Sequence, residues 1–223
     1  MSLFLRLFGN IDKNYFFIIC FSVVALVLLI SNPGYFSHDE MQKLDHVIRF
    51  GFSNYVDSYT RFHVGDNFGQ PVRPLSFYIQ GVLALFMVKY PVIVHLSAVL
   101  SHGINACLFY AVILAFGLRK SLALVSALIF IVNPLGIFSV GWSAALMDRW
   151  YVCFGLAALL CAHHYVLKKG GILPLLGLLL FSSLAIMSKE TAIILPGLML
   201  LLIVHDFAVF RAIDGDKSDN ING

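Results

Sequence analysis

Two adjacent carboxylates, Asp39 and Glu40, stand just beyond the first apolar run of the chain. Paired carboxylates of this kind can act as a general base with a supporting partner, and they can also bind a divalent cation. The same residues fit the first turn of a helix, where acidic side chains are favoured. The two interpretations are compatible, because the start of a helix can also carry a catalytic acid.

Basic side chains stand at the ends of other apolar runs. Lys189 and Glu190 form a short polar turn between two such runs, and Arg73 directly precedes Pro74. A lysine or arginine in this position can bind a phosphate group. It can equally serve as an anchor whose charged end reaches water at a membrane surface. The residues alone leave both alternatives open.

Further polar residues lie near or within the apolar runs. Asp148 and Arg149 stand between two tryptophans spaced like an aromatic belt, so they face either interfacial water or an outer cavity. His95 and His102 are seven residues apart and share one face of a helix, which we expect to point into a helix bundle. Metal binding would need a closer histidine spacing or further ligands, so we predict no metal site there.

The composition identifies the elements that position these side chains as membrane helices. Of 223 residues, 60% are apolar and only 12% are charged, and the mean hydropathy is +0.88. Soluble domains are about 25% charged, so a soluble enzyme, a disordered chain and a disulfide scaffold are excluded. The net charge of +3 is small and scattered, and nucleic acid is not an expected partner. The four cysteines lie in apolar runs and form no metal-binding or redox motif.

Helices that span a membrane need about 20 mostly apolar residues. One membrane module over residues 1–213 is predicted, with spans at 15–31, 91–117, 121–138, 146–167, 172–187 and 191–210. The first span is interpreted as an uncleaved signal-anchor. Pro134, Pro174 and Pro196 are expected to kink their helices. Residues 214–223 form a polar tail that we expect to be disordered.

The basic residues predict the direction of these spans. Arg119-Lys120 and Lys168-Lys169 fall in short loops, which places them on the cytoplasmic side. They share that side with the amino terminus only if the apolar stretch 74–90 does not cross. We therefore predict six crossings with both termini inside, and an interfacial or re-entrant helix over residues 74–90. Residue 67 is then outside and residue 169 inside.

This topology gathers most acidic residues on the outer side of the membrane. The external segment 32–90, the loop 133–145 and the turn 188–190 all face outward. Seven acids then share that side: Asp39, Glu40, Asp45, Asp57, Asp66, Asp148 and Glu190.

In this order the motifs resemble those of the GT-C membrane glycosyltransferases. The similarity is greatest to the branch that holds the protein O-mannosyltransferases and the transmembrane-and-tetratricopeptide mannosyltransferases, and it covers residues 15–210. The matching residues in this chain are Asp39-Glu40, Arg73-Pro74-Leu75, His95 and His102, Asn133-Pro134 (His-Pro in the family) with Trp142, Asp148, and Ser188-Lys189-Glu190-Thr191. The chain departs from the family at Ala98, Phe138 and Leu146, where the family often has Asn, Glu and Arg.

The resemblance implies an inverting transfer of a sugar from a polyprenyl-phosphate donor to an acceptor hydroxyl on the outer or lumenal face. Asp39 is then the catalytic base, with Glu40 beside it. The other implied site residues are Lys189, Arg73 and Arg149 for the donor phosphate, and Glu190, Asp148, His95 and His102 in support. We expect the base and the cations to line one outer cavity. No cofactor is required, and a divalent metal is compatible with the site without being demanded.

The expected partners are the lipid-linked donor, a protein, lipid or glycan acceptor, and membrane lipids. The expected location is the plasma or inner membrane in a bacterium and the endoplasmic reticulum in a eukaryote. Two rival interpretations stay open: a transporter or flippase subunit, which predicts broken helices around mid-membrane charges, and a non-catalytic remnant. Family members continue with further spans, so the chain is expected to be a fragment, a minimal relative or an inactive remnant.

Overall fold

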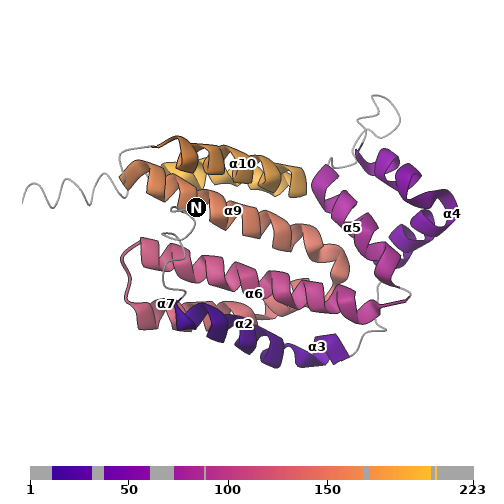
Figure 1. Ribbon diagram of the computed structural model, residues 1–223, viewed down its shortest axis with the longest axis horizontal. Helices are drawn as coiled ribbons and strands as arrows, with labels where there is room; N and C mark the ends of the chain where they lie inside the picture. Colours follow the sequence, from indigo (N-terminus) through magenta and orange to yellow (C-terminus); the bar gives the residue numbers. More distant parts are fainter. Residues whose placement is uncertain are drawn as a thin grey trace, which may run out of the picture.

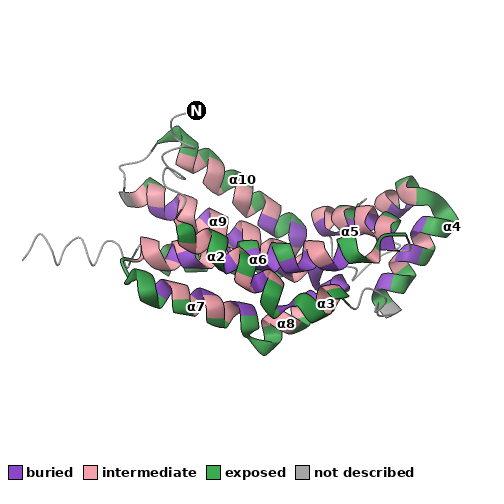
Figure 2. Ribbon diagram, turned by 60° about the horizontal axis from the view of Figure 1, so that its bottom comes forward, coloured by how far each residue is buried: buried purple, intermediate pink, exposed green. Residues whose placement is uncertain are grey.

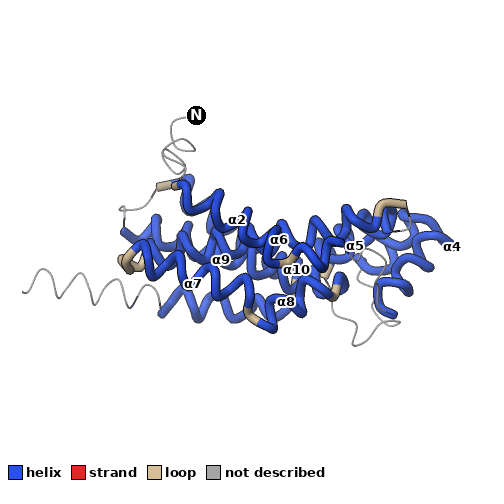
Figure 3. Tube along the Cα trace, turned by 90° about the horizontal axis from the view of Figure 1, so that it is seen from below, coloured by secondary structure: helices blue, strands red, loops and turns tan. Residues whose placement is uncertain are grey.

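The computed structural model describes residues 12–31, 38–60, 73–87, 89–167, 171–201 and 204. These residues form helices and connecting turns without a strand (Figures 1 and 3), so the expected all-helical class is confirmed. The elements are α2 (Lys13–Ala25), α3 (Val27–Ser31), α4 (His38–Thr60), α5 (Pro74–Met87), α6 (Pro91–Ala115), α7 (Lys120–Val132), α8 (Pro134–Gly141), η1 (Ser143–Ala145), α9 (Leu146–Leu167), α10 (Ile172–Ser188) and η2 (Glu190–Ile194). An apolar helical segment continues from η2 to Leu201.

Helix α6 packs against α2, α7 and α9, and α10 packs against α9 (Figure 1). Small side chains make the contact between α6 and α7 close. Ala98 and Ala106 of α6 share one buried cluster with Ala123 and Ala127 of α7, and Ile18 of α2 belongs to the same cluster. Small residues let helix backbones approach each other, which is how helices associate within membranes.

The outward faces of this bundle carry many exposed apolar side chains, and Figure 2 shows exposed positions along α7. Leu28 of α3 is 77% exposed, and Ile129 of α7 is 58% exposed. A helix that is apolar on all sides is typical of a buried or lipid-facing element. These faces therefore fit a bundle that sits in a bilayer.

Successive segments run in opposite directions along the bundle (Figure 1). Helices α2, α3, α7 and α8 run one way, α6 and α9 run the other way, and α10 reverses the direction of α9. The start of α2, the α6–α7 turn and the start of α10 therefore lie at one end, which we call the basic end because it carries Lys13, Arg119 and Lys120. We call the opposite end, with the start of α6, the α8–α9 corner and the end of α10, the site end.

The reversal between α6 and α7 depends on Gly117, whose φ of 77° is rarely adopted by other residues. The Gly117 N–H bonds to the Leu114 carbonyl at 3.0 Å, and the Leu118 N–H bonds to the Ile113 carbonyl at 3.4 Å. This pair of bonds is the Schellman arrangement that satisfies the last carbonyls of a helix. The sequence Gly117-Leu118 thus ends α6 and turns the chain back into α7.

Among the described residues, two helical segments are long and apolar enough to cross a membrane as single helices: α6 and Ser143–Val166, which joins η1 to all but the last residue of α9. The pair α7 and α8 passes the same test, but it is bent by 50° at a break. The Asn133 side chain accepts a hydrogen bond of 2.9 Å from the Leu135 N–H, and Pro134 begins α8. The expected kink at Pro134 is therefore present, whereas Pro174 lies in the first turn of α10, a position where proline is tolerated.

The remaining predicted spans correspond to shorter apolar helices. The first is divided at Leu26 into α2 and α3, and α10 and the segment Glu190–Leu201 are each below spanning length by the same test. Residues 202, 203 and 205–210 of the last predicted span lie outside the described part. The count of six crossings stays a prediction.

Helices α4 and α5 pack side by side beyond the site end (Figure 1). Helix α4 bends at Gly51, whose φ is 82° and ψ is 159°. Leu44 of α4, Met87 of α5 and Val94 of α6 share a buried cluster that fastens this pair to the bundle. The stretch expected as an interfacial or re-entrant helix is therefore α5, and it begins and ends at the site end.

Candidate functional site

The site end brings two oppositely charged pairs together from distant parts of the chain. Arg73, at the start of α5, donates to both carboxylate oxygens of Glu190, with an Nε–Oε2 distance of 2.6 Å. Lys189 Nζ pairs with Asp148 in the first turn of α9. Neighbouring residues of one turn thus bind partners on two different elements. This turn, Ser188-Lys189-Glu190, joins α10 to η2.

The cations of these pairs are less exposed than the acids. The side chains of Arg73 and Lys189 are 16% and 21% exposed, while those of Glu190 and Asp148 are 54% and 39% exposed. The positive groups are therefore held near the protein surface by surrounding side chains, and their carboxylate partners face water. Such an arrangement can exchange a carboxylate for another anion without moving the cation far.

The main chain around the turn is held by a buried hydrogen bond. Ser76 Oγ of α5 donates to the Ser188 carbonyl at 2.8 Å, and both residues are fully buried. Lys189 follows with an extended backbone, φ −158° and ψ 137°, before η2 begins. The turn is thereby fixed to α5, so Lys189 and Arg73 keep their relative positions.

The bidentate contact with Arg73 changes the acidity of Glu190. Hydrogen bonds from Arg73 lower the pKa of the Glu190 carboxyl from 4.5 to about 2, although partial burial acts in the opposite direction. Glu190 is therefore ionised at every physiological pH. Its negative charge therefore balances the positive charge of Arg73.

Glu40 and Arg149 form a buried charged region beside the exposed pairs. Glu40 is 2% exposed, and its Oε1 accepts a hydrogen bond of 2.8 Å from the Ala144 N–H in η1. Arg149 is 4% exposed, its Nη1 donates to the Ser139 carbonyl, and its Nε has no hydrogen-bond partner among the described residues. The carboxylates of Glu40 and Asp148 both interact electrostatically with the Arg149 guanidinium. This region therefore links α4 to the α8–α9 corner.

Asp39 and Glu40 differ sharply in their surroundings. Asp39 is exposed in the first turn of α4, whereas Glu40 is buried and hydrogen-bonded. An exposed carboxylate at the edge of the site end can meet an acceptor from solution, but a buried carboxylate held by a main-chain N–H cannot. Of the two adjacent carboxylates, only Asp39 is therefore accessible from solution.

The polar face of α6 packs inward, as its spacing predicts. His95, His102 and Asn105 are all buried. His102 Nε2 lies 3.3 Å from the Ile131 carbonyl, and its ring stacks on Phe130 with 5.0 Å between centroids. Asn105 Nδ2 donates to the Arg149 carbonyl at 2.9 Å. His102 and Asn105 therefore tie α6 to α7 and α9 from within the bundle.

The described residues contain no group of three or more His, Cys, Asp or Glu side chains arranged to hold a metal ion. The acids at the site end are instead divided between separate cations. Asp66 and His38, which belong to the same polar segment, have side chains outside the described part.

Sequence reasoning missed the contacts that hold these charges. It did not single out Ser76 or the Ala144 N–H, although a serine in the first turn of an apolar helix is a signal for a buried hydrogen bond. It also missed a network at the basic end, where Asp12 accepts from Tyr110 Oη at 2.7 Å and pairs with Lys120 Nζ at 2.8 Å. Burial raises the pKa of Asp12, but the hydrogen bonds from Lys120 and Tyr110 outweigh it and lower that pKa overall.

Comparison with protein-family models, curated proteins and solved structures finds no match to this chain. The GT-C resemblance therefore rests on the order and spacing of the sequence motifs. The geometry of the site end is independent of that resemblance, because it follows from the packing of α4, α5, α9 and α10.

Proposed function

We propose that the protein is an inverting glycosyltransferase that moves a sugar from a polyprenyl-phosphate donor to an acceptor hydroxyl. The observation that carries this proposal is that Arg73 and Lys189 each pair with an acid at the bundle end where α4 begins with Asp39 in its first turn. A transferase of this class needs cations for the lipid phosphate and a base for the acceptor within one region. Both are present at the edge of an apolar bundle, where a lipid-linked donor would arrive.

Donor binding would proceed by exchange of anions. The Asp148 carboxylate is 39% exposed, so a phosphate can approach Lys189 from the water side and replace it. Arg73 offers a planar fork that matches phosphate oxygens in the same way as it matches Glu190. Arg149 supplies further positive charge from within. Its Nε is a donor for which the described residues provide no acceptor.

The transfer itself would be a single displacement. Asp39 takes the proton of the acceptor hydroxyl while that oxygen forms a bond to the anomeric carbon. The bond from the anomeric carbon to the phosphate oxygen breaks at the same time, and its electron pair leaves with the polyprenyl phosphate. General-base assistance contributes about 10²–10⁴-fold, and cations that stabilise the departing phosphate supply a further part.

The topology belongs to the same proposal. Six crossings would put the site end outside and the basic end inside, in agreement with the placement of basic residues in short loops. The alternating direction of the helices and the position of α5 at the site end support this count (Figure 1).

The test is a transfer assay with the full chain in lipid nanodiscs. A panel of polyprenyl-phosphate-linked hexoses is offered with and without hydroxyl acceptors, and the release of polyprenyl phosphate is measured. We expect release by the wild type, loss of release in Asp39→Asn, and full release in Asp45→Asn, which changes another exposed acid of α4. Release that is equal in all three proteins would contradict the proposal.

A transporter is the second candidate, because the break between α7 and α8 is the kind of discontinuity that transporter sites use. The charged residues lie at helix ends, which is less typical of that class. A flipping assay in sealed vesicles separates the two functions. Donor that moves between leaflets with its sugar–phosphate bond intact would favour transport over transfer.

A further inference from the structure

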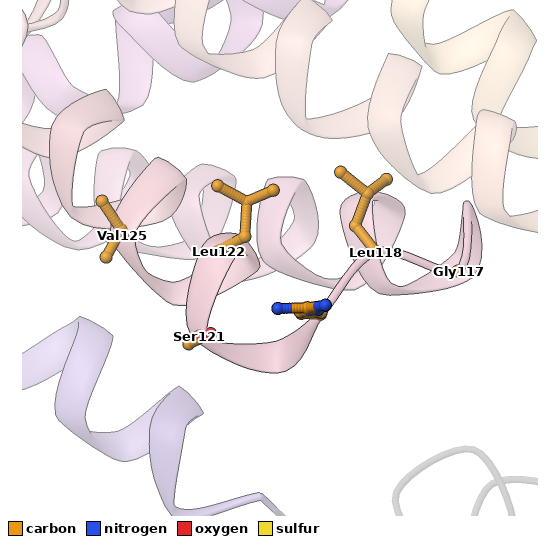
Figure 4. Close-up of a pocket in the computed structure, with 6 residues that line it drawn as sticks. Gly117, Leu118, Ser121, Leu122 and Val125 are labelled. Atoms are coloured by element: carbon orange, nitrogen blue, oxygen red, sulfur yellow. The ribbon is translucent and has the colours of Figure 1, made fainter.

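A broad, open surface hollow of about 680 Å³, which we call the cavity, lies at the basic end (Figure 4). Its lining comes from the turn between α6 and α7 and from the first two turns of α7. The residues are Gly117, Leu118, Arg119, Ser121, Leu122 and Val125. The cavity thus combines one cation and one hydroxyl with an apolar wall.

The apolar wall is an exposed surface and not part of the core. Leu118, Leu122 and Val125 are 43%, 49% and 51% exposed. On the opposite face of α7, Ala123 and Ala127 are fully buried against the bundle. Helical spacing therefore divides α7 into a packed face and an open apolar face. The open face continues along the helix from the cavity toward the middle of the bundle.

The cation of the cavity lacks a counter-charge. Lys120 is paired with Asp12 at 2.8 Å, whereas its neighbour Arg119 is exposed and has no carboxylate within ion-pair distance among the described residues. An arginine that is not neutralised by the protein attracts an external anion. The hydroxyl of Ser121, in the same cavity, can donate to that anion as well.

We propose that this cavity binds an anionic phospholipid, with its phosphate on Arg119 and Ser121 and an acyl chain along Leu118, Leu122 and Val125. Charge complementarity selects an anionic headgroup. The apolar wall selects a lipid over a soluble phosphate, because a free phosphate would leave that wall in contact with water. This site is separate from the proposed transfer site, and neither assignment depends on the other.

Native mass spectrometry of the full chain tests this site. The protein is taken from nanodiscs that contain equal amounts of phosphatidylglycerol and phosphatidylcholine, and the retained lipids are counted. We expect the wild type to retain more phosphatidylglycerol than phosphatidylcholine. In Arg119→Gln the ratio of the two lipids should be about fivefold lower, the usual contribution of one basic residue near a membrane surface. The control is Arg49→Gln, which removes an exposed arginine of α4 far from the cavity and should keep the preference.

Two further measurements distinguish binding of a lipid from binding of free phosphate. They also keep the site testable if Arg119→Gln fails to fold. Phosphatidylglycerol should raise the unfolding temperature of the wild type in detergent more than phosphatidylcholine does, and millimolar inorganic phosphate should not abolish that difference. Leu122→Gln should weaken phosphatidylglycerol retention, although it leaves the charge of the protein unchanged. The site is overturned if the wild type shows no lipid preference, if Arg119→Gln retains it, or if inorganic phosphate displaces the lipid.

Discussion

The carboxylate of Glu40 accepts a hydrogen bond of 2.8 Å from the Ala144 N–H, although the two residues are 104 positions apart in the chain. The bond fastens the start of α4 to the corner between α8 and α9. Because Glu40 is buried, its neighbour Asp39 is held at the surface of the same corner. The two adjacent acids therefore differ: Glu40 is buried and hydrogen-bonded, and Asp39 is exposed.

Replacing Glu40 should therefore affect stability before it affects chemistry. Glu40→Ala removes the acceptor of a buried N–H and a charge near Arg149, and we expect a loss of about 1–3 kcal/mol in the free energy of unfolding. Glu40→Gln keeps an acceptor oxygen and should lose less. Unfolding in detergent measures both, with Asp45→Ala as the exposed control on α4. Equal stability of Glu40→Ala and Asp45→Ala would contradict a structural role for the Glu40 hydrogen bond.

Replacements of Lys189 and of Asp148 should have different effects on donor binding. Lys189→Ala removes one charge-assisted contact to the phosphate, and we expect polyprenyl-phosphate affinity to fall by about tenfold. Asp148→Asn removes the carboxylate that competes with the phosphate, so affinity should stay equal or rise. The matched control is Lys120→Ala, since Lys120 is also paired with an acid but lies at the basic end. Unchanged binding by Lys189→Ala would exclude it as a phosphate ligand.

The Arg73–Glu190 pair should give the stability a defined pH dependence. The pKa of Glu190 is lowered to about 2 by Arg73, so the stabilisation is fully present above pH 4.5 and is lost as the pH falls through about 2. The difference in unfolding temperature between the wild type and Glu190→Gln should be constant near neutral pH and shrink as the pH approaches about 2. A difference that grows on acidification would contradict the sign of this shift.

Cysteine labelling should place the two ends of the bundle on opposite sides of the membrane. In a background without Cys20, Cys107, Cys153 and Cys161, we expect an impermeant maleimide to label Asn54→Cys from outside and Arg119→Cys only after the membrane is opened. Residues 67 and 169 provide the same contrast, although both lie outside the described part.

Permeabilised cells provide the control for this labelling, because both cysteines should react there. Labelling of Arg119→Cys from outside would reverse the topology and place the proposed transfer site on the wrong face.

The sequence predicted the helices well where long apolar runs have clear ends. The expected span 146–167 has the same bounds as α9, and the expected 172–187 differs from α10 by one residue. The break at Leu26 was not predicted, because an apolar run carries no signal for a local change in backbone direction. The kink at Pro134 was predicted, since proline removes a helical hydrogen bond.

The site was only partly predictable, for a physical reason. Charged residues at the ends of apolar runs are visible in the sequence, and they indicated Arg73 and Lys189. The choice of partners depends on packing between α5, α9 and α10, and no local pattern encodes the contact between Arg73 and Glu190 across 117 residues. The burial of Glu40 beside exposed Asp39 likewise depends on how α4 docks.

A photoreactive polyprenyl phosphate provides the most direct test of the proposed site. The probe carries the reactive group beside its phosphate, and the full chain is cross-linked in nanodiscs before peptides are mapped. We predict modification at the start of α5 and in the turn Ser188-Lys189-Glu190, and competition by an unmodified polyprenyl-phosphate sugar. Cross-links confined to the basic end, or cross-links at the site end that the donor does not displace, would contradict the assignment of the site end to the donor phosphate.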